Sequence, residues 1–492
     1  MAKDKLTNKW TRWLVVAVIL VGAMLRLYGL KIQSLWCDEL ASWDYGHWSS
    51  VTEVMSKAVK QDLHPPGYHL LMHWIIMYWG DSEVMLRLPS VLAGILVIPA
   101  MYLLGKRIYG KSEGLIAAGL VAVTWAPVYY SQEARPYSLI LLLTVLGMYW
   151  WMGVMISWKQ KQKARTGEIF GYLLSAIGLT YLHYYGFLLV GLESVAALIY
   201  FKRNRYALTR WVGLYVSVGL SHLWWWPILG YQFSNNGQKI SWITKPTVAV
   251  FLDYALWLFN NSAKLLLIVG ALLTWWAGIN LARIKTRRDL KKQLMSPGVF
   301  LGLWLVLPIS IAFIASQMIT PAMALRNLII SLPAALLLVA RSTTQISRHK
   351  KVNVLVGTGL VILMLYQLVW RGAYYTKQTK EQYRQATQFI TNHENEYPDA
   401  VIVGYEHVNR HFNYYLQRQG NPKKVEIMAG EAKDIGRLEE YLNYRQPKYF
   451  WYIRAHRIPE DLFIKYLDSH YGLIKKQLFI GADVWLYQTS YN

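Results

Sequence analysis

The sequence contains a single cysteine, Cys37, among 492 residues, so no disulfide can form within the chain. We therefore expect packing and the lipid bilayer to hold the extracytoplasmic parts together, and we assign Cys37 no role of its own. A small-residue cleavage pattern is also missing after the first apolar run, 13–30. Because this run is long enough to cross a bilayer, we interpret it as a signal anchor.

Acidic residues are scarce, with 28 Asp and Glu against 52 Lys and Arg and a formal net charge of +24. Such an excess raises the question of a nucleic-acid partner, but the positive charge lies in short loops between apolar runs. Six segments hold 25 Lys and Arg and only four acidic residues: 1–12, 105–113, 158–168, 202–210, 283–292 and 341–351. These clusters are typical of the cytoplasmic face of a membrane protein, and we expect no nucleic-acid partner.

The apolar content predicts a polytopic α-helical membrane protein, since 54% hydrophobic residues with 23 Trp and 35 Tyr are too many for an ordinary soluble domain. Of twelve apolar runs, 64–80 has an amphipathic stripe and is interpreted as an interfacial helix. The alternative is that it spans and another run does not. The eleven remaining spans place the N-terminus in the cytoplasm and the C-terminus outside. They are 13–30, 88–105, 114–131, 137–157, 169–182, 184–201, 211–230, 262–282, 298–315, 327–340 and 352–371.

The composition changes to a soluble pattern after Arg371, which divides the chain into a transmembrane domain, 1–371, and a smaller domain, 372–492. Helical signals near 380–393 and 407–419 alternate with β-like runs near 400–403, 449–453 and 484–488. This alternation predicts a small extracytoplasmic α/β domain. It contains no Gly-rich phosphate loop and no metal-ligand spacing, so a binding or supporting role is expected.

Two adjacent carboxylates, Asp38 and Glu39, follow the first span. Carboxylates beside a bilayer are costly to desolvate, which favours a chemical role. One of them can serve as a general base towards an acceptor hydroxyl. Neighbouring residues cannot point the same way on a regular element, so the other is expected to orient a substrate or a basic partner. A helix cap or a surface ion pair is the alternative.

The eleven-span topology brings further polar residues to the same outer face. Arg135 and Arg326 carry guanidinium forks suited to phosphate, although an arginine that snorkels to the interface is the alternative. Pro65 and Pro66 form a rigid turn after Asp62 and His64, which is equally a plain helix start. The remaining candidates on this face are Gln132, Glu133, Tyr137 and His183.

The chain resembles the polyprenyl-phosphate-dependent membrane glycosyltransferases of the GT-C fold, in particular the bacterial branch related to protein O-mannosyltransferases and lipid A aminoarabinose transferases. The resemblance implies about eleven transmembrane helices, with interfacial helices in the first outer loop, in the inner or plasma membrane. It rests on these motifs: Trp36-Cys37-Asp38-Glu39, Asp62-Leu63-His64-Pro65-Pro66, Arg87-Leu88-Pro89-Ser90, Ser131-Gln132-Glu133-Ala134-Arg135-Pro136-Tyr137-Ser138 and Arg326-Asn327-Leu328.

The resemblance also implies roles for single residues. Asp38 corresponds to the catalytic base and Glu39 to its companion acid. His64 stands where some relatives have a lysine, and Asn327 replaces a common aromatic residue. Glu133 lies near an acidic position that holds a divalent metal in some of these enzymes, so a metal remains open. The donor phosphate is assigned to His64, Arg135, Arg326 and Tyr137, and support or acceptor binding to Asp62, Gln132, Glu133 and His183.

The predicted reaction is an inverting transfer of a hexosyl or pentosyl group from a polyprenyl-phosphate donor to an extracytoplasmic glycan, lipid or protein. A transporter or flippase of lipid-linked sugars is one alternative, and an O-antigen-type polymerase or ligase is another. Transporters usually carry ionisable residues near the middle of the membrane and often contain internal repeats. This sequence has few such charges and no evident repeat, which favours the transferase.

Overall fold

The computed structural model describes residues 2–236, 243–406 and 408–490. Contacts within the chain divide it into two compact units. The first contains Met1–Tyr28, Ser49–Trp74 and Arg87–Tyr374, and the second contains Gly29–Trp48, Ile75–Leu86 and Tyr375–Asn492. Two segments of the first outer loop are therefore grouped with the C-terminal residues. The last boundary between the units, at Tyr374 and Tyr375, lies close to the boundary expected at Arg371.

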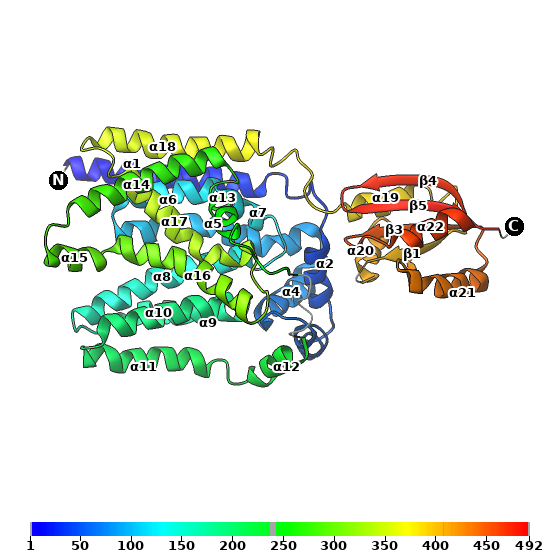
Figure 1. The fold of residues 1–492 in the computed structure, drawn as a ribbon, viewed down its shortest axis with the longest axis horizontal. Helices are drawn as coiled ribbons and strands as arrows, with labels where there is room; N and C mark the ends of the chain where they lie inside the picture. Colours follow the sequence, from blue (N-terminus) through cyan, green and yellow to red (C-terminus); the bar gives the residue numbers. More distant parts are fainter. Residues whose placement is uncertain (1, 237–242, 407, 491–492) are drawn as a thin grey trace. The chain divides into compact units, whose positions relative to one another are not determined.

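The first unit consists of helices (Figure 1). Helix α4 continues into the second unit and α5 begins there. The helical elements are α1 (Ala2–Leu27), α3 (Val51–Glu53), η1 (Val54–Ala58), η2 (Val59–Gln61), α4 (Pro66–Trp79), α5 (Glu83–Ile108), α6 (Lys111–Val123), α7 (Trp125–Ser131), α8 (Tyr137–Lys159), α9 (Thr166–Leu182), α10 (Tyr185–Phe201), α11 (Arg205–Leu220), α12 (Trp226–Asn236), α13 (Val250–Leu258), α14 (Ala263–Ala282), α15 (Arg287–Leu294), α16 (Pro297–Met318), η4 (Leu325–Ser331), α17 (Leu332–Thr343), α18 (Lys350–Tyr366) and η5 (Gln367–Arg371).

Among the described residues, seven helical segments are long and apolar enough to cross a membrane, and the bent pair α6 and α7 makes eight. Three other expected spans correspond to α9, α10 and α11, which have 16 or 17 residues. A count of eleven crossings therefore stays a prediction. Helix α4, with 14 residues, is about 21 Å long at 1.5 Å per residue, too short to cross alone. The run expected over 211–230 is not continuous, because α11 ends at Leu220 and α12 begins at Trp226.

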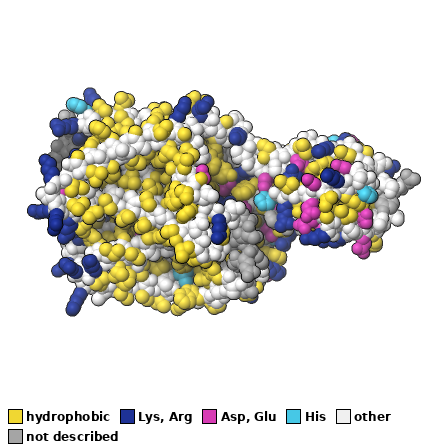
Figure 2. Space-filling view, in the orientation of Figure 1, with side chains coloured by type: hydrophobic (Ala, Val, Ile, Leu, Met, Phe, Trp, Pro, Cys, Tyr) yellow, Lys and Arg dark blue, Asp and Glu magenta, His cyan; other side chains and the backbone are white. Residues whose placement is uncertain are grey.

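The surface of the helical unit is apolar over a wide area (Figure 2). Large side chains such as Leu20, Leu267 and Leu355 are exposed, as expected for helices that face lipid rather than water. Figure 2 also shows dark blue Lys and Arg side chains gathered at the end of this unit where α15 lies. Basic side chains therefore gather at one end of the unit, and the expectation that this end faces the cytoplasm stays a prediction.

Helix α6 ends at Val123 and α7 restarts at Trp125 with a bend of 56°. A break inside a membrane leaves backbone groups in need of partners. The buried Arg26 of α1 donates to the carbonyls of Val121 and Ala122 at 3.1 and 3.0 Å. Asn260 donates to the carbonyl of Val123 and accepts from the amide of Trp125. These two side chains stabilise the bend that leads into the segment after Ser131.

The second unit contains a five-stranded sheet in the order β2-β1-β3-β5-β4. Strand β1 is parallel to β2 and β3, whereas β5 is antiparallel to β3 and β4. The register pairs Ile402 with Trp451 and Trp451 with Leu486. The elements are α2 (Cys37–Gly46), α19 (Tyr383–Asn392), β1 (Val401–Tyr405), α20 (Arg410–Arg418), β2 (Val425–Met428), η6 (Ala432–Asp434), α21 (Ile435–Arg445), β3 (Tyr449–Ala455), α22 (Asp461–His470), β4 (Gly472–Phe479) and β5 (Ala482–Gln488).

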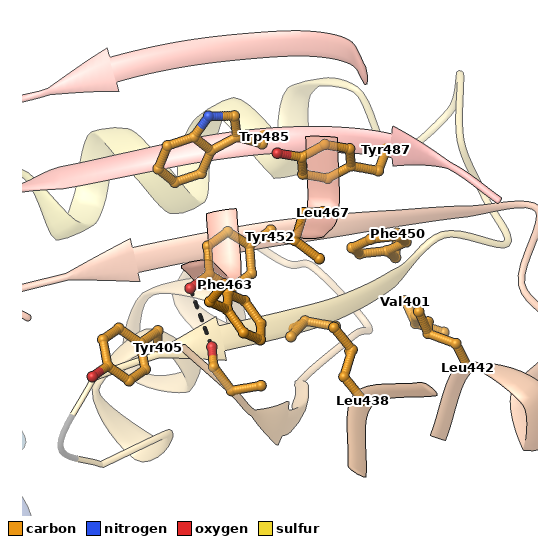
Figure 3. Packing of buried hydrophobic residues seen from close by; sticks show 12 residues of the cluster. Val401, Tyr405, Leu438, Leu442, Phe450, Tyr452, Phe463, Leu467, Trp485 and Tyr487 are labelled. Carbon is orange, nitrogen blue, oxygen red and sulfur yellow. Dashed lines mark hydrogen bonds between the residues drawn. The ribbon is translucent and has the colours of Figure 1, made fainter. Parts of the chain in front are cut away.

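The core on one face of the sheet is made by side chains of β1, β3 and β5 that pack against α21 and α22 (Figure 3). Tyr452 lies at its centre, and its hydroxyl donates to the carbonyl of Ala429 at 3.1 Å. Leu438 and Phe463 are fully buried against this face. Burial of this aromatic-rich cluster holds the sheet and its helices together without a disulfide.

Candidate functional site

Asp62 lies between two histidines in the first unit, after η2 and before α4. Its Oδ2 accepts hydrogen bonds from Nδ1 of His64 at 2.9 Å and from Nε2 of His69 at 3.0 Å. Burial alone would raise the pKa of Asp62, but the charge and hydrogen bond of His64, together with the hydrogen bond of His69, hold it well below its usual value. The carboxylate is therefore ionised at neutral pH and fixes the orientation of both rings.

His183 follows α9 and is buried next to His64, with their ring centroids 5.7 Å apart. Burial lowers the pKa of His183 well below its usual value, and the charges of His64, Arg135 and Arg326 lower it further. The ring is therefore neutral at neutral pH. Its Nδ1 accepts from the backbone N–H of Tyr185, which places the ring proton on Nε2. The charges of His64, Arg135 and Arg326 that act on this ring indicate a region rich in positive charge.

Arg326 and Tyr137 also lie close to His183. The guanidinium of Arg326, at the start of η4, stands 5.9 Å from the ring centroid of Tyr137, within the range of a cation–π contact. The Tyr137 ring lies 6.4 Å from that of His183. We call Asp62, His64, Arg135, Tyr137, His183 and Arg326 the histidine–arginine cluster.

Arg135 enters the cluster because of the loop between α7 and α8. Pro136 occupies the N-cap position of α8, and the hydroxyl of Ser90 on α5 donates to the carbonyl of Arg135 at 2.9 Å. These contacts fix the backbone on both sides of the arginine. Arg135 is buried, and its permanently charged guanidinium fork has a shape that suits a phosphate or a carboxylate.

Gln132 and Glu133 stand in the same loop but differ in their surroundings. Gln132 donates to the carbonyl of Arg26 in the last turn of α1 at 3.0 Å and to that of Tyr28 just after the helix at 2.7 Å, and it accepts from the hydroxyl of Tyr374. It therefore ties this loop to the end of α1, a supporting position. Glu133 is buried, with a side chain that is 1% exposed.

Asp38 and Glu39 lie in the first turn of α2 in the second unit, where the helix dipole favours a carboxylate. Glu39 is fully buried, and Nζ of Lys380 donates to its Oε2 at 2.9 Å. Asp38 is partly exposed and its backbone carbonyl accepts from Ser42. The two neighbours therefore point into different surroundings, as adjacent residues on a helix must. Sequence reasoning missed Lys380, which lies 341 residues from its partner and belongs to no motif.

A metal at Glu133 stays a prediction. Within the described ranges, one group of three or more His, Cys, Asp and Glu side chains is placed to share an ion, and Glu133 is outside it. That group consists of Cys37, Glu406 and His411 in the second unit.

The structure brings together most of the outer-face residues expected from topology. Asp62, His64, Tyr137, His183 and Arg326 meet in the first unit although they come from four separate chain segments. Asp38 and Glu39 belong to the second unit. A chamber shared by Asp38 and Arg135 stays a prediction.

Part of the chain matches a known family model. Residues 63–231 match the family model described as dolichyl-phosphate-mannose-protein mannosyltransferase. No curated protein matches the chain by sequence. This family match includes His64, Arg135, Tyr137 and His183, but not Asp38 or Arg326.

Similar solved structures cover nearly the whole chain. ArnT from Cupriavidus metallidurans in the apo state has a TM-score of 0.60 at 11% identity, over 98% of both chains. ArnT from the same organism bound to undecaprenyl phosphate has a TM-score of 0.58 at 11% identity, over 97% of this chain and 98% of that one. The archaeal oligosaccharyltransferase AglB from Archaeoglobus fulgidus, in complex with an inhibitory peptide and a dolichol-phosphate, has a TM-score of 0.52 at 12% identity, over 97% and 74%. The chain is therefore a multi-pass membrane protein with the GT-C fold of polyprenyl-phosphate-dependent glycosyltransferases.

Proposed function

We propose that the protein transfers a sugar from a polyprenyl-phosphate donor to an acceptor outside the cytoplasm, with inversion at the anomeric carbon. The observation that carries this proposal is the histidine–arginine cluster, which gathers cationic and hydrogen-bonding side chains within a GT-C fold. Solved structures of this fold contain undecaprenyl phosphate in one case and a dolichol-phosphate in another. A lipid phosphate matches the charge of the cluster.

The leaving group determines what the cluster has to do. When the bond between the anomeric carbon and the phosphate oxygen breaks, the electron pair stays on the phosphate, which gains a negative charge. Arg135 and Arg326 stabilise that charge as it develops. His64, oriented by Asp62, adds a third group with a fixed direction. Because the phosphate departs as a stabilised anion, protonating the leaving group matters little.

Asp38 acts as the general base in this scheme. Its carboxylate takes the proton of the acceptor hydroxyl while the acceptor oxygen attacks the face of the sugar opposite the phosphate. Glu39 is buried against Lys380, so it acts through the position of α2 rather than on the acceptor. The acceptor is a glycan, lipid or protein hydroxyl, and the sugar is a hexose or a pentose.

The test begins with mass spectrometry of the lipid that copurifies with the protein in mild detergent, which identifies the sugar-loaded donor. Protein and this donor are then reconstituted in liposomes with a cell-envelope fraction as acceptor source, and release of unloaded polyprenyl phosphate is followed. Asp38→Asn should reduce the rate by at least about 100-fold. Asp461→Asn is the matched control, because Asp461 is also in the first turn of a helix of the second unit and is exposed.

If the Asp38→Asn variant releases polyprenyl phosphate at the wild-type rate, the assignment of Asp38 as the base is wrong. A flippase would instead move the lipid between leaflets in liposomes that contain no acceptor, without breaking the sugar–phosphate bond. A lipid-scrambling assay on the same preparation distinguishes the two, and we expect no scrambling.

A further inference from the structure

Cys37 at the start of α2, Glu406 after β1 and His411 at the start of α20 bring a thiol, a carboxylate and an imidazole together inside the second unit. Sγ of Cys37 lies 3.5 Å from Oε1 of Glu406, and Nδ1 of His411 lies 3.0 Å from the same oxygen. One ligand atom from each residue falls within 4.8 Å of the other two. We propose that Cys37, Glu406 and His411 bind one divalent transition-metal ion, with zinc the best match.

The spacing and the donor atoms support this choice. Metal bonds of about 2.3 Å to sulfur and about 2.0–2.2 Å to nitrogen or oxygen place neighbouring ligands of a tetrahedral ion some 3.3–3.6 Å apart. The observed separations are close to that range. A thiolate with an imidazole and a carboxylate suits zinc, whereas calcium and magnesium prefer oxygen ligands alone. Three protein ligands leave one position for water.

His411 offers Nδ1 to the site, because this is the nitrogen that lies 3.0 Å from Oε1 of Glu406. The residue is 2% exposed, and its Nε2 has no hydrogen-bond partner among the described residues. Burial on α20 therefore fixes the ring beside the carboxylate.

Hydrogen bonds around the carboxylate are consistent with a metal ligand. When the sulfur–metal bond forms, the thiol proton is released to solvent. The other oxygen of Glu406 accepts from the amide of Val408 at 2.6 Å, and Oε1 accepts from the hydroxyl of Tyr383 at 3.0 Å. These bonds orient the carboxylate, as outer-shell partners of metal ligands do.

Metal binding would tie the first turn of α2, which carries Asp38, to the end of β1 and to α20. The effect on sugar transfer rests on the proposed function, since it assumes that Asp38 is the base. Metal binding itself does not depend on that function and is measured without a donor or an acceptor.

The experiment uses the full chain in detergent, dialysed first against a chelator and then against zinc chloride, with metal content measured by inductively coupled plasma mass spectrometry. We expect about one zinc per wild-type chain. Cys37→Ser and His411→Gln should lose it, and Gln at position 411 can still donate to Glu406, which preserves the fold. His470→Gln is the matched control, because His470 is an exposed histidine of the same unit, and it should retain the metal.

Cobalt provides a second readout that reports the ligand directly. The cobalt form of the wild type should show a near-ultraviolet thiolate-to-cobalt charge-transfer band, which can come only from Cys37 because the chain has no other cysteine. Absence of bound zinc in the wild type, or equal zinc in wild type and both variants, would overturn the proposal. A cobalt form without the band would do the same. If Asp38→Asn keeps full transfer while zinc binding holds, the proposed function fails and the metal site stands.

Discussion

Arg135 is the residue in the histidine–arginine cluster whose shape matters as much as its charge. Its guanidinium can donate two parallel hydrogen bonds to one phosphate, whereas a lysine offers a single point charge. The loop that carries it is fixed by Ser90 and by Pro136. We therefore expect the fork, and not the net charge alone, to determine turnover.

Arg135→Gln should lower the rate of polyprenyl-phosphate release by about 100- to 1,000-fold, in line with the loss of one transition-state donor. Arg135→Lys should recover part of that loss. Arg348→Gln, which removes an exposed arginine from a basic loop, is the control and should leave the rate unchanged. Equal activity of Arg135→Gln and the wild type would remove Arg135 from the phosphate site.

His456 gives a pH-dependent prediction for the second unit. Its Nδ1 lies 2.7 Å from Oε1 of Glu381, and this hydrogen bond raises the pKa of His456 above its usual value. A raised pKa means that the stabilisation is complete below the unfolded pKa of about 6.5 and is lost as pH rises through the folded value. Because His456 has a positive φ, Asn is the compatible replacement.

His456→Asn should therefore unfold at a lower temperature than the wild type at pH 6. The loss in the free energy of unfolding should be under about 1 kcal/mol, because the pair is partly exposed. The difference should shrink towards pH 9. Thermal unfolding at several pH values measures it. A difference that grows with pH would contradict the assigned pair.

Helices α5 and α6 approach each other closely at two glycines, Gly105 on α5 and Gly114 on α6. A Cβ on Gly114 would stand 2.5 Å from the carbonyl oxygen of Tyr102 and 2.9 Å from the amide of Lys106. Both are backbone atoms, which cannot rotate away. Such glycine contacts are common where membrane helices pack tightly.

Gly114→Ala should destabilise the protein by about 1–3 kcal/mol through this overlap. Gly213→Ala on α11 is the matched control, because no atom lies within 4 Å of a Cβ there, and it should be neutral or slightly stabilising. Thermal unfolding in detergent measures both. An unchanged melting temperature for Gly114→Ala would mean that α5 and α6 separate more readily than their packing indicates.

Sequence patterns predicted some elements well and others poorly, for physical reasons. The apolar runs corresponding to α5, α8 and α16 are visible because they are long and uniformly apolar. Strand β4 was not predicted, because it is an exposed edge strand whose lysines interrupt the β pattern. The break between α6 and α7 was not predicted either, since it depends on Arg26 and Asn260, which come from distant segments.

The same contrast holds for the site. Topological parity was enough to gather His64, His183 and Arg326 on one face, because odd-numbered spans end on the same side. It could not reveal that Lys380 neutralises Glu39 or that Cys37 meets His411. Those contacts join segments more than 300 residues apart and depend on tertiary packing within the second unit.

The orientation of the whole molecule is testable with fusions to the C-terminus. We expect the basic loops in the cytoplasm and residues after Arg371 outside. Alkaline phosphatase fused after the last residue should be active in cells, whereas green fluorescent protein at the same position should be dark when exported through the general secretory pathway. The reverse pattern would place the proposed base, Asp38, on the wrong side of the membrane.

Asp38 and the histidine–arginine cluster are proposed to act on one donor molecule. The most direct measurement is an experimental structure of the protein with undecaprenyl phosphate bound. We expect the phosphate within hydrogen-bond distance of Arg135 and Arg326, with the Asp38 carboxylate lining the same cavity. A phosphate held away from these arginines, or an Asp38 carboxylate that faces a different compartment, would contradict this proposal.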